Sequence, residues 1–178
     1  MRRALTLTLV LLLGLSSAFA LTACGDDTKV VTDTNSQGEE TVRTVADVKF
    51  AKTQFVAHMG LAYGAFRRYI QRPYNEGRFT NGADGRTAAI AKAALAAAFS
   101  YSELKRAHKA AQSDDTLRKK LLDPFDRLLD RFGGAVGTLE AGKLPDVASL
   151  IGSFAGIKEL AKAAGVDFNA VAGDIPGL

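Results

Sequence analysis

From about residue 46 onward, apolar residues recur every three or four positions, the spacing that gathers them on one face of an amphipathic helix. The polar residues between them fill the opposite faces. The pattern predicts helices over residues 46–74 and 86–111, a third over about 115–139, and a fourth between Pro145 and Gly165. The predicted core stripes include Phe55, Met59, Phe66; Ile90, Ala97, Leu104; Leu117, Leu121, Phe125, Leu128, Phe132; and Leu150, Phe154, Ile157.

These four segments, with little strand signal between them, predict an all-α fold: an antiparallel four-helix bundle. Ser113, Asp114 and Asp115 offer N-caps and first-turn acids for the third helix. Pro124 interrupts that helix, so we expect either a kink or short break, or a new start that Asp123 caps. The stretch around Gly77, Gly82 and Gly85 is typical of a loop. The residues after Gly165 are expected to fold over one end.

The N-terminus has the three-part layout of a secretory signal. Arg2 and Arg3 precede an apolar run over residues 4–13, and small and apolar residues continue to Cys24. The run is shorter than the roughly 20 residues that span a bilayer as a permanent helix. An uncleaved membrane helix with an incidental cysteine is the alternative.

The residues Leu21-Thr22-Ala23-Cys24 resemble the lipobox of bacterial lipoproteins. The resemblance implies a diacylglyceryl thioether on Cys24, cleavage before it, and acylation of the new amino group. Residues 1–23 are then a signal peptide. The mature chain is expected outside the cytoplasm, anchored to a bacterial membrane through this lipid.

Between the cysteine and the first predicted helix, residues 24–45 are rich in Gly, Asp, Thr, Ser and Glu and have no helical stripe. Such a segment buries too little apolar surface to fold by itself. We predict a lipidated cysteine followed by a disordered linker, which as a flexible coil would reach roughly 25 Å. The helical domain, residues 46–178, would then rotate freely near the bilayer.

Composition narrows the possible functions. The formal charge of +4 includes Arg2 and Arg3 of the signal, so the mature surface is nearly balanced and nucleic acid is not an expected partner. With Cys24 as the one cysteine, the domain has neither a disulfide nor a cysteine-based zinc site.

Residues that carry chemistry are sparse. His58 and His108 lie on or near the apolar stripes, about 9 Å out of level in a folded-back helix pair, so each is expected to hydrogen-bond a neighbour rather than share a metal. The acidic residues of the third helix alternate with Arg127 and Arg131, as on a solvated face. No haem, di-iron, zinc or nucleophile motif is present. We therefore expect no enzymatic activity, no cofactor and no metal.

Glycines four apart occur at Gly60 and Gly64 and again at Gly152 and Gly156. We interpret both pairs as sites of close helix approach within the bundle. The first pair lies roughly opposite the core stripe of its helix, so it requires a second contact, for which a partner is one possibility.

The best candidate surface is the end of the first helix, where aromatic residues alternate with arginines. It consists of Arg67, Arg68, Arg72, Tyr74 and Arg78. Such a surface can bind an envelope protein or an anionic ligand. Alternatively, its aromatics serve the core and its arginines complement the negative end of the helix dipole.

The sequence thus predicts a lipid-anchored extracytoplasmic helical protein, a non-enzymatic interaction or structural component of the bacterial cell envelope. The alternative function is a ligand-binding module that holds a lipid, haem or metal within the bundle.

Overall fold

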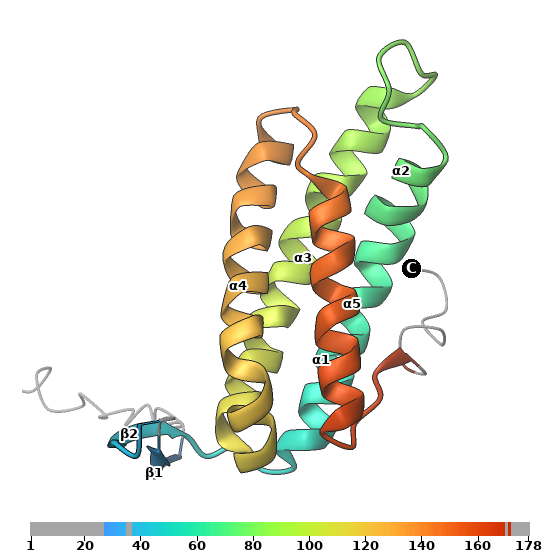
Figure 1. The fold of residues 1–178 in the computed structure, drawn as a ribbon. Helices are drawn as coiled ribbons and strands as arrows, with labels where there is room; N and C mark the ends of the chain where they lie inside the picture. Colours follow the sequence, from blue (N-terminus) through green and yellow to red (C-terminus); the bar gives the residue numbers. More distant parts are fainter. Residues whose placement is uncertain (1–26, 35–36, 170, 172–178) are drawn as a thin grey trace, which may run out of the picture.

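The computed structural model describes residues 27–34, 37–169 and 171 (Figure 1). The predicted signal peptide and Cys24 lie outside the described residues. The described chain forms a β-hairpin followed by helices. The elements are β1 (Thr28–Thr34), β2 (Glu40–Ala46), α1 (Ala51–Phe66), η1 (Arg67–Gln71), α2 (Arg72–Asn75), α3 (Arg86–Ser113), α4 (Asp115–Glu140) and α5 (Val147–Ala163).

The long helices pack side by side and run alternately up and down in Figure 1. Helices α1, η1 and α2 follow one another without a gap and form one continuous helical stretch. Consecutive helices are neighbours, α1 with α3, α3 with α4 and α4 with α5. The predicted all-α fold is confirmed as far as the chain is mostly helical with four long helices, and the two-stranded sheet was not predicted. Within the described residues, no helix has both the length and the apolar character needed to cross a bilayer.

The interior is built around aromatic rings. Phe66 of the first helix lies with its ring centroid 5.6 Å from that of Phe132 in α4 and 4.9 Å from that of Phe154 in α5. Phe132 and Phe154 are themselves 5.3 Å apart, nearly edge to face. These positions belong to the stripes predicted from the sequence, and all three side chains are almost fully buried. The centre of the helical domain is therefore filled by side chains.

Helix α4 continues through Pro124 as one element, so the predicted short break, or new start capped by Asp123, is wrong. Proline removes one backbone donor from the ladder, yet Leu121, Phe125 and Leu128 around it are buried. Their packing keeps the helix continuous. Of the three candidate residues at the start of the helix, Asp114 is the N-cap, since its side chain accepts hydrogen bonds from the amides of Thr116 and Leu117 at 3.0 Å.

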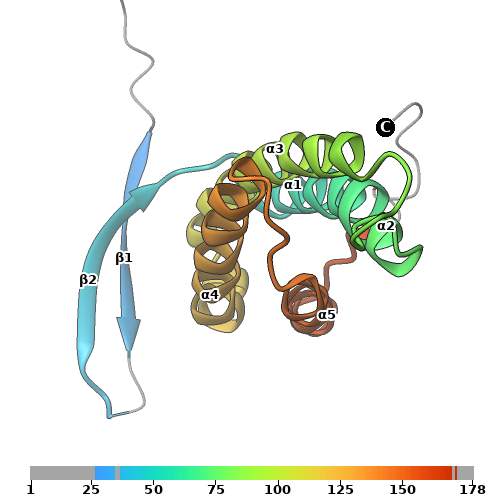
Figure 2. The ribbon, with the colours of Figure 1, turned by 90° about the horizontal axis from the view of Figure 1, so that it is seen from above.

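The prediction of a disordered linker over residues 24–45 is wrong for most of its length. β1 and β2 pair antiparallel, with Thr28 opposite Ala46 and Thr34 opposite Glu40. Ala46, placed at the start of the first helix by the sequence, belongs to β2, and that helix begins at Ala51. The hairpin lies beside the helices next to α4 (Figure 2). Its valines and threonines favour strands, and Val31 and Val45 are buried, whereas most of β2 is exposed.

The glycine pairs differ from their prediction. In α5, an added Cβ at Gly152 or Gly156 would meet no atom within 4 Å, so neither marks a close helix approach. At Gly60, an added Cβ would lie only 2.5 Å from Val171. The second contact of Gly60 is thus the chain's own C-terminal segment, where Phe168 is buried against the core.

Candidate functional site

The candidate surface Arg67, Arg68, Arg72, Tyr74 and Arg78, hereafter the arginine surface, lies in η1, in α2 and in the turn after it. In Figure 1 this is the end of the helical domain away from the hairpin. All five side chains are exposed. The position gives this surface access to partners that approach from that end.

A change of helix type shapes the arginine surface. Over Arg67–Gln71 the helix widens into a π-helix, in which the amide of Arg72 donates to the carbonyl of Arg67, five residues earlier. A π-helical turn adds a residue without breaking the helix, and such turns are frequent at functional sites. Here it keeps Ile70 buried, while Arg67 and Arg68 face solvent. The spacing of apolar residues did not predict this turn.

Within the arginine surface, Glu76 joins two of the arginines. Its Oε1 accepts from Arg72 Nε at 2.9 Å, and its Oε2 accepts from Arg78 Nε at 2.8 Å. The hydrogen bonds from Arg78 and then Arg72 hold the pKa of Glu76 below its usual value. The sequence reasoning did not select Glu76, although it stands four residues after Arg72, an ordinary ion-pair spacing on a helix.

The other two arginines remain outside that cluster. The guanidinium of Arg68 lies 5.5 Å from the ring centroid of Tyr69, within the range of a cation–π contact. In the part of the chain that the structure describes, neither Arg67 nor Arg68 forms an ion pair. Their charge is therefore available to an acidic group, whereas Glu76 partly neutralises Arg72 and Arg78.

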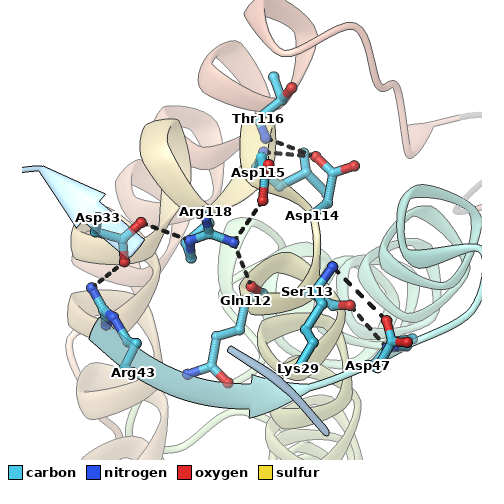
Figure 3. Close-up of polar contacts among 12 residues, drawn as sticks. Lys29, Asp33, Arg43, Asp47, Gln112, Ser113, Asp114, Asp115, Thr116 and Arg118 are labelled. Carbon is cyan, nitrogen blue, oxygen red and sulfur yellow. Dashed lines mark hydrogen bonds and ion pairs between the residues drawn. The ribbon is translucent and has the colours of Figure 1, made fainter. Parts of the chain in front are cut away.

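A second polar cluster joins the hairpin to the helices and was not predicted. Its centre is Arg118 of α4, whose side chain is 3% exposed. Arg118 Nε donates to Asp33 Oδ1 at 2.8 Å, and Arg118 Nη1 lies 2.9 Å from Asp115 Oδ1 and donates to the carbonyl of Gln112 at 3.2 Å (Figure 3). Arg43 Nη2 lies 2.7 Å from Asp33 Oδ2. We call these residues the hairpin lock.

Two kinds of contact hold the hairpin on the helices: the polar hairpin lock and apolar side chains beside it. The hydrogen bond from Arg118 holds the pKa of Asp33 below its usual value, against the opposing effect of burial. On the same face of the hairpin, Val31 and Val45 are each 7% exposed. Just beyond β2, the amide of Val48 donates to Ser113 Oγ at 2.9 Å. The hairpin is thus fixed to the end of α3 and the start of α4.

The two histidines lie beside separate carboxylates, and the predicted hydrogen bond to a neighbour is present for His58 but not for His108, whose Nε2 is close to a carboxylate without the geometry of a hydrogen bond. His58 Nδ1 lies 2.6 Å from Glu103 Oε2, and Glu103 is nearly buried. His108 Nε2 lies 2.8 Å from Asp126 Oδ1. Asp126 therefore has a role that the solvated-face interpretation of its helix missed. Among the described residues, no three His, Cys, Asp or Glu side chains gather in a group that could hold a metal ion.

Comparison with protein-family models, with curated proteins and with solved structures finds no match to this chain.

Proposed function

We propose that this chain is a lipid-anchored extracytoplasmic protein of the bacterial cell envelope, and that it acts as a non-enzymatic interaction module. Its arginine surface binds an acidic group on an envelope partner. We also propose that its helices form an antiparallel four-helix bundle. The observation that carries the proposal is the position of two features at opposite ends of the molecule. The hairpin that leads back to Cys24 is at one end, and the arginine surface is at the other.

The distance between the two ends supports binding of a partner that lies away from the membrane surface. The continuous helical stretch from α1 through α2 covers residues 51–75. Arg67 and Arg68 come 16 and 17 residues after Ala51, which at about 1.5 Å per residue places them roughly 25 Å along this stretch. A partner that contacts Arg67 and Arg68 would meet them well outside the headgroup region. A membrane lipid of the same bilayer is for this reason a less suitable anionic ligand.

The alternative of a lipid, haem or metal held inside the bundle has less support. The rings of Phe66, Phe132 and Phe154 occupy the centre of the helical domain at mutual distances of 4.9–5.6 Å. A haem-sized ligand would have to displace them. Close-packed interiors resist such rearrangement, because each lost ring contact costs stability.

The anchoring part is tested by a Cys24→Ser variant expressed in a bacterium that processes lipoproteins. The unaltered chain is expected to carry a diacylglyceryl adduct on Cys24 by mass spectrometry and to fractionate with membranes. The variant is expected to accumulate as an unprocessed precursor or to leave the membrane. Lipid labelling and membrane retention that are the same in both chains would contradict the anchoring.

The recognition part is tested by crosslinking in intact membranes. We expect a reproducible envelope partner that the double variant Arg67→Ala/Arg68→Ala loses, with capture weakening as salt rises. The matched control is Lys92→Ala/Arg127→Ala, which removes two exposed cations from α3 and α4. Equal capture by both variants, or no partner under any condition, would count against the arginine surface.

A further inference from the structure

Phe50, between β2 and α1, has an unusual conformation. Its side chain is 83% exposed, the most exposed large apolar side chain among the described residues. Its φ of 54° places it in the left-handed region, which bulky residues rarely adopt. Backbone strain and exposed apolar surface both lower the stability of the folded chain. The packing of the helical domain explains neither feature of Phe50.

Phe50 lies close in the chain to the point where the lipid would emerge. The amide of Asp47 donates to the carbonyl of Asp27 at 2.5 Å, which ties the start of β1 to the end of β2. Gly25 and Asp26 alone separate Cys24 from Asp27, and Val48 and Lys49 alone separate Asp47 from Phe50. Three chain steps span at most about 11 Å. The attachment point of the lipid and that of the ring, the Cα atoms of Cys24 and Phe50, are therefore each within about 11 Å of a residue of this one hydrogen-bonded pair.

The neighbours of Phe50 suit a bilayer surface. Lys49 and Lys52 are both exposed, and within the described residues neither takes part in an ion pair. Lysine side chains can extend along apolar surface and leave their ammonium groups at the headgroups. Segments that lie at the boundary between headgroups and acyl chains combine Lys or Arg with Trp, Phe or Leu, the basic groups staying at the headgroups while the apolar side chains enter.

We propose that Phe50, flanked by Lys49 and Lys52, is a second membrane contact, inserting into the bilayer that holds the Cys24 lipid. This inference rests on the proposed lipidation of Cys24. Because the hairpin lock fixes the hairpin to α4, two contact points set the orientation of the domain. The arginine surface is then held away from the membrane, and free rotation about the lipid is prevented.

The chain contains no tryptophan, so a single introduced one reports its own surroundings. Phe50→Trp is made in the full, lipidated protein and reconstituted into vesicles of phosphatidylethanolamine and phosphatidylglycerol. The reference is the same Phe50→Trp change in the unlipidated Cys24→Ser protein, in solution without detergent. Compared with this reference, the tryptophan emission of the vesicle-bound protein is expected to lie at shorter wavelength. Lipids brominated along the acyl chain are expected to quench it.

The matched control is Leu95→Trp in the same protein. Leu95 is also apolar and 75% exposed, but it lies on α3 about 27 Å along the helix from Ser113, which contacts the hairpin side. Its emission is expected to stay at the wavelength of a water-exposed indole, without quenching. Circular dichroism confirms that both variants are folded.

The outcomes separate the two proposals. Lipid on Cys24 and co-flotation with vesicles, together with an unquenched Trp at position 50, would overturn the Phe50 contact and leave the anchor standing. Equal quenching at positions 50 and 95 would also overturn it, because the domain would then lie on its side. A chain without lipid on Cys24 would overturn both proposals.

Discussion

Arg118 Nε donates a hydrogen bond of 2.8 Å to Asp33 Oδ1 across 85 residues of sequence. The arginine is nearly buried, whereas the carboxylate is 18% exposed. Removing one partner of such a pair leaves the other charge with poor solvation. This contact makes the hairpin part of the folded domain.

Replacing Arg118 by Ala is expected to release the hairpin. The variant loses the hydrogen bond that joins α4 to Asp33 of β1, together with the contacts to Asp115 and Gln112 that position the guanidinium. A hydrogen bond to a charged group contributes about 1.5–3 kcal/mol to stability. Hydrogen–deuterium exchange should show faster exchange of the amides of β1 and β2, with the α3 amides little changed. Arg43→Ala is the control, because its side chain is 48% exposed and its loss should matter less. Unchanged hairpin protection in Arg118→Ala would contradict the lock.

Hairpin docking should weaken in acid. The pKa of Asp33 lies below its ordinary value of 3.8 because Arg118 favours the ionised form. A lowered folded pKa contributes stability that is present above about pH 4 and is lost as pH falls through the folded value. The difference in hairpin protection between the unaltered chain and Asp33→Asn should therefore be constant at neutral pH and shrink below about pH 4. A difference that does not depend on pH would exclude this role of Asp33.

Phe50→Asn is expected to stabilise the unlipidated protein. Asparagine tolerates positive φ far better than phenylalanine, and relief of that strain should add about 0.5–1 kcal/mol to the free energy of unfolding. Urea denaturation measures the change, with Leu95→Asn as control, because Leu95 is also an exposed large apolar residue. The same Phe50→Asn variant should hold the membrane less firmly when lipidated. A loss of stability would show that the ring packs in solution.

Gly60→Ala and Gly156→Ala should change stability in opposite directions. At Gly60 the new methyl group would stand 2.5 Å from Val171 and 3.3 Å from the Phe168 carbonyl, so the C-terminal segment must move. The cost of such overpacking is about 1–3 kcal/mol. At Gly156 no atom lies within 4 Å, and the helix gains about 0.5–1 kcal/mol. Thermal unfolding of both variants tests the pair, and a stabilised Gly60→Ala would show that Val171 is not held there.

The sequence predicted the helices well where an apolar stripe continued over several turns. The stripe of α4, from Leu117 through Leu139, is buried at every predicted position. The same rule failed for the hairpin, because Val31 and Val45 are buried by contact with distant helices rather than by a local pattern. A short two-stranded ribbon is marginal by itself, so composition alone indicated disorder.

The candidate site was predicted in part. The arginines of the arginine surface were found because they are close in sequence. The π-helical turn at Arg67–Gln71 was not, since it arises from how Phe66 and Ile70 both reach the core. Arg118 was overlooked because its partner Asp33 is distant in sequence. Pairings of this kind become visible only once the fold brings the two segments together.

The antiparallel hairpin also has a mechanical consequence under the proposed anchoring. Its connection toward Cys24 leaves at Thr28 and its connection to the helices leaves at Ala46, and these two residues face each other. A force applied to the domain away from the anchor would therefore break the hydrogen bonds between the strands one pair after another, rather than all at the same time as in shear. Complete opening of residues 28–46 would release roughly 65 Å of chain. Under load between the bilayer and a partner, the hairpin would unfold and lengthen the connection before the lipid is pulled out of the bilayer.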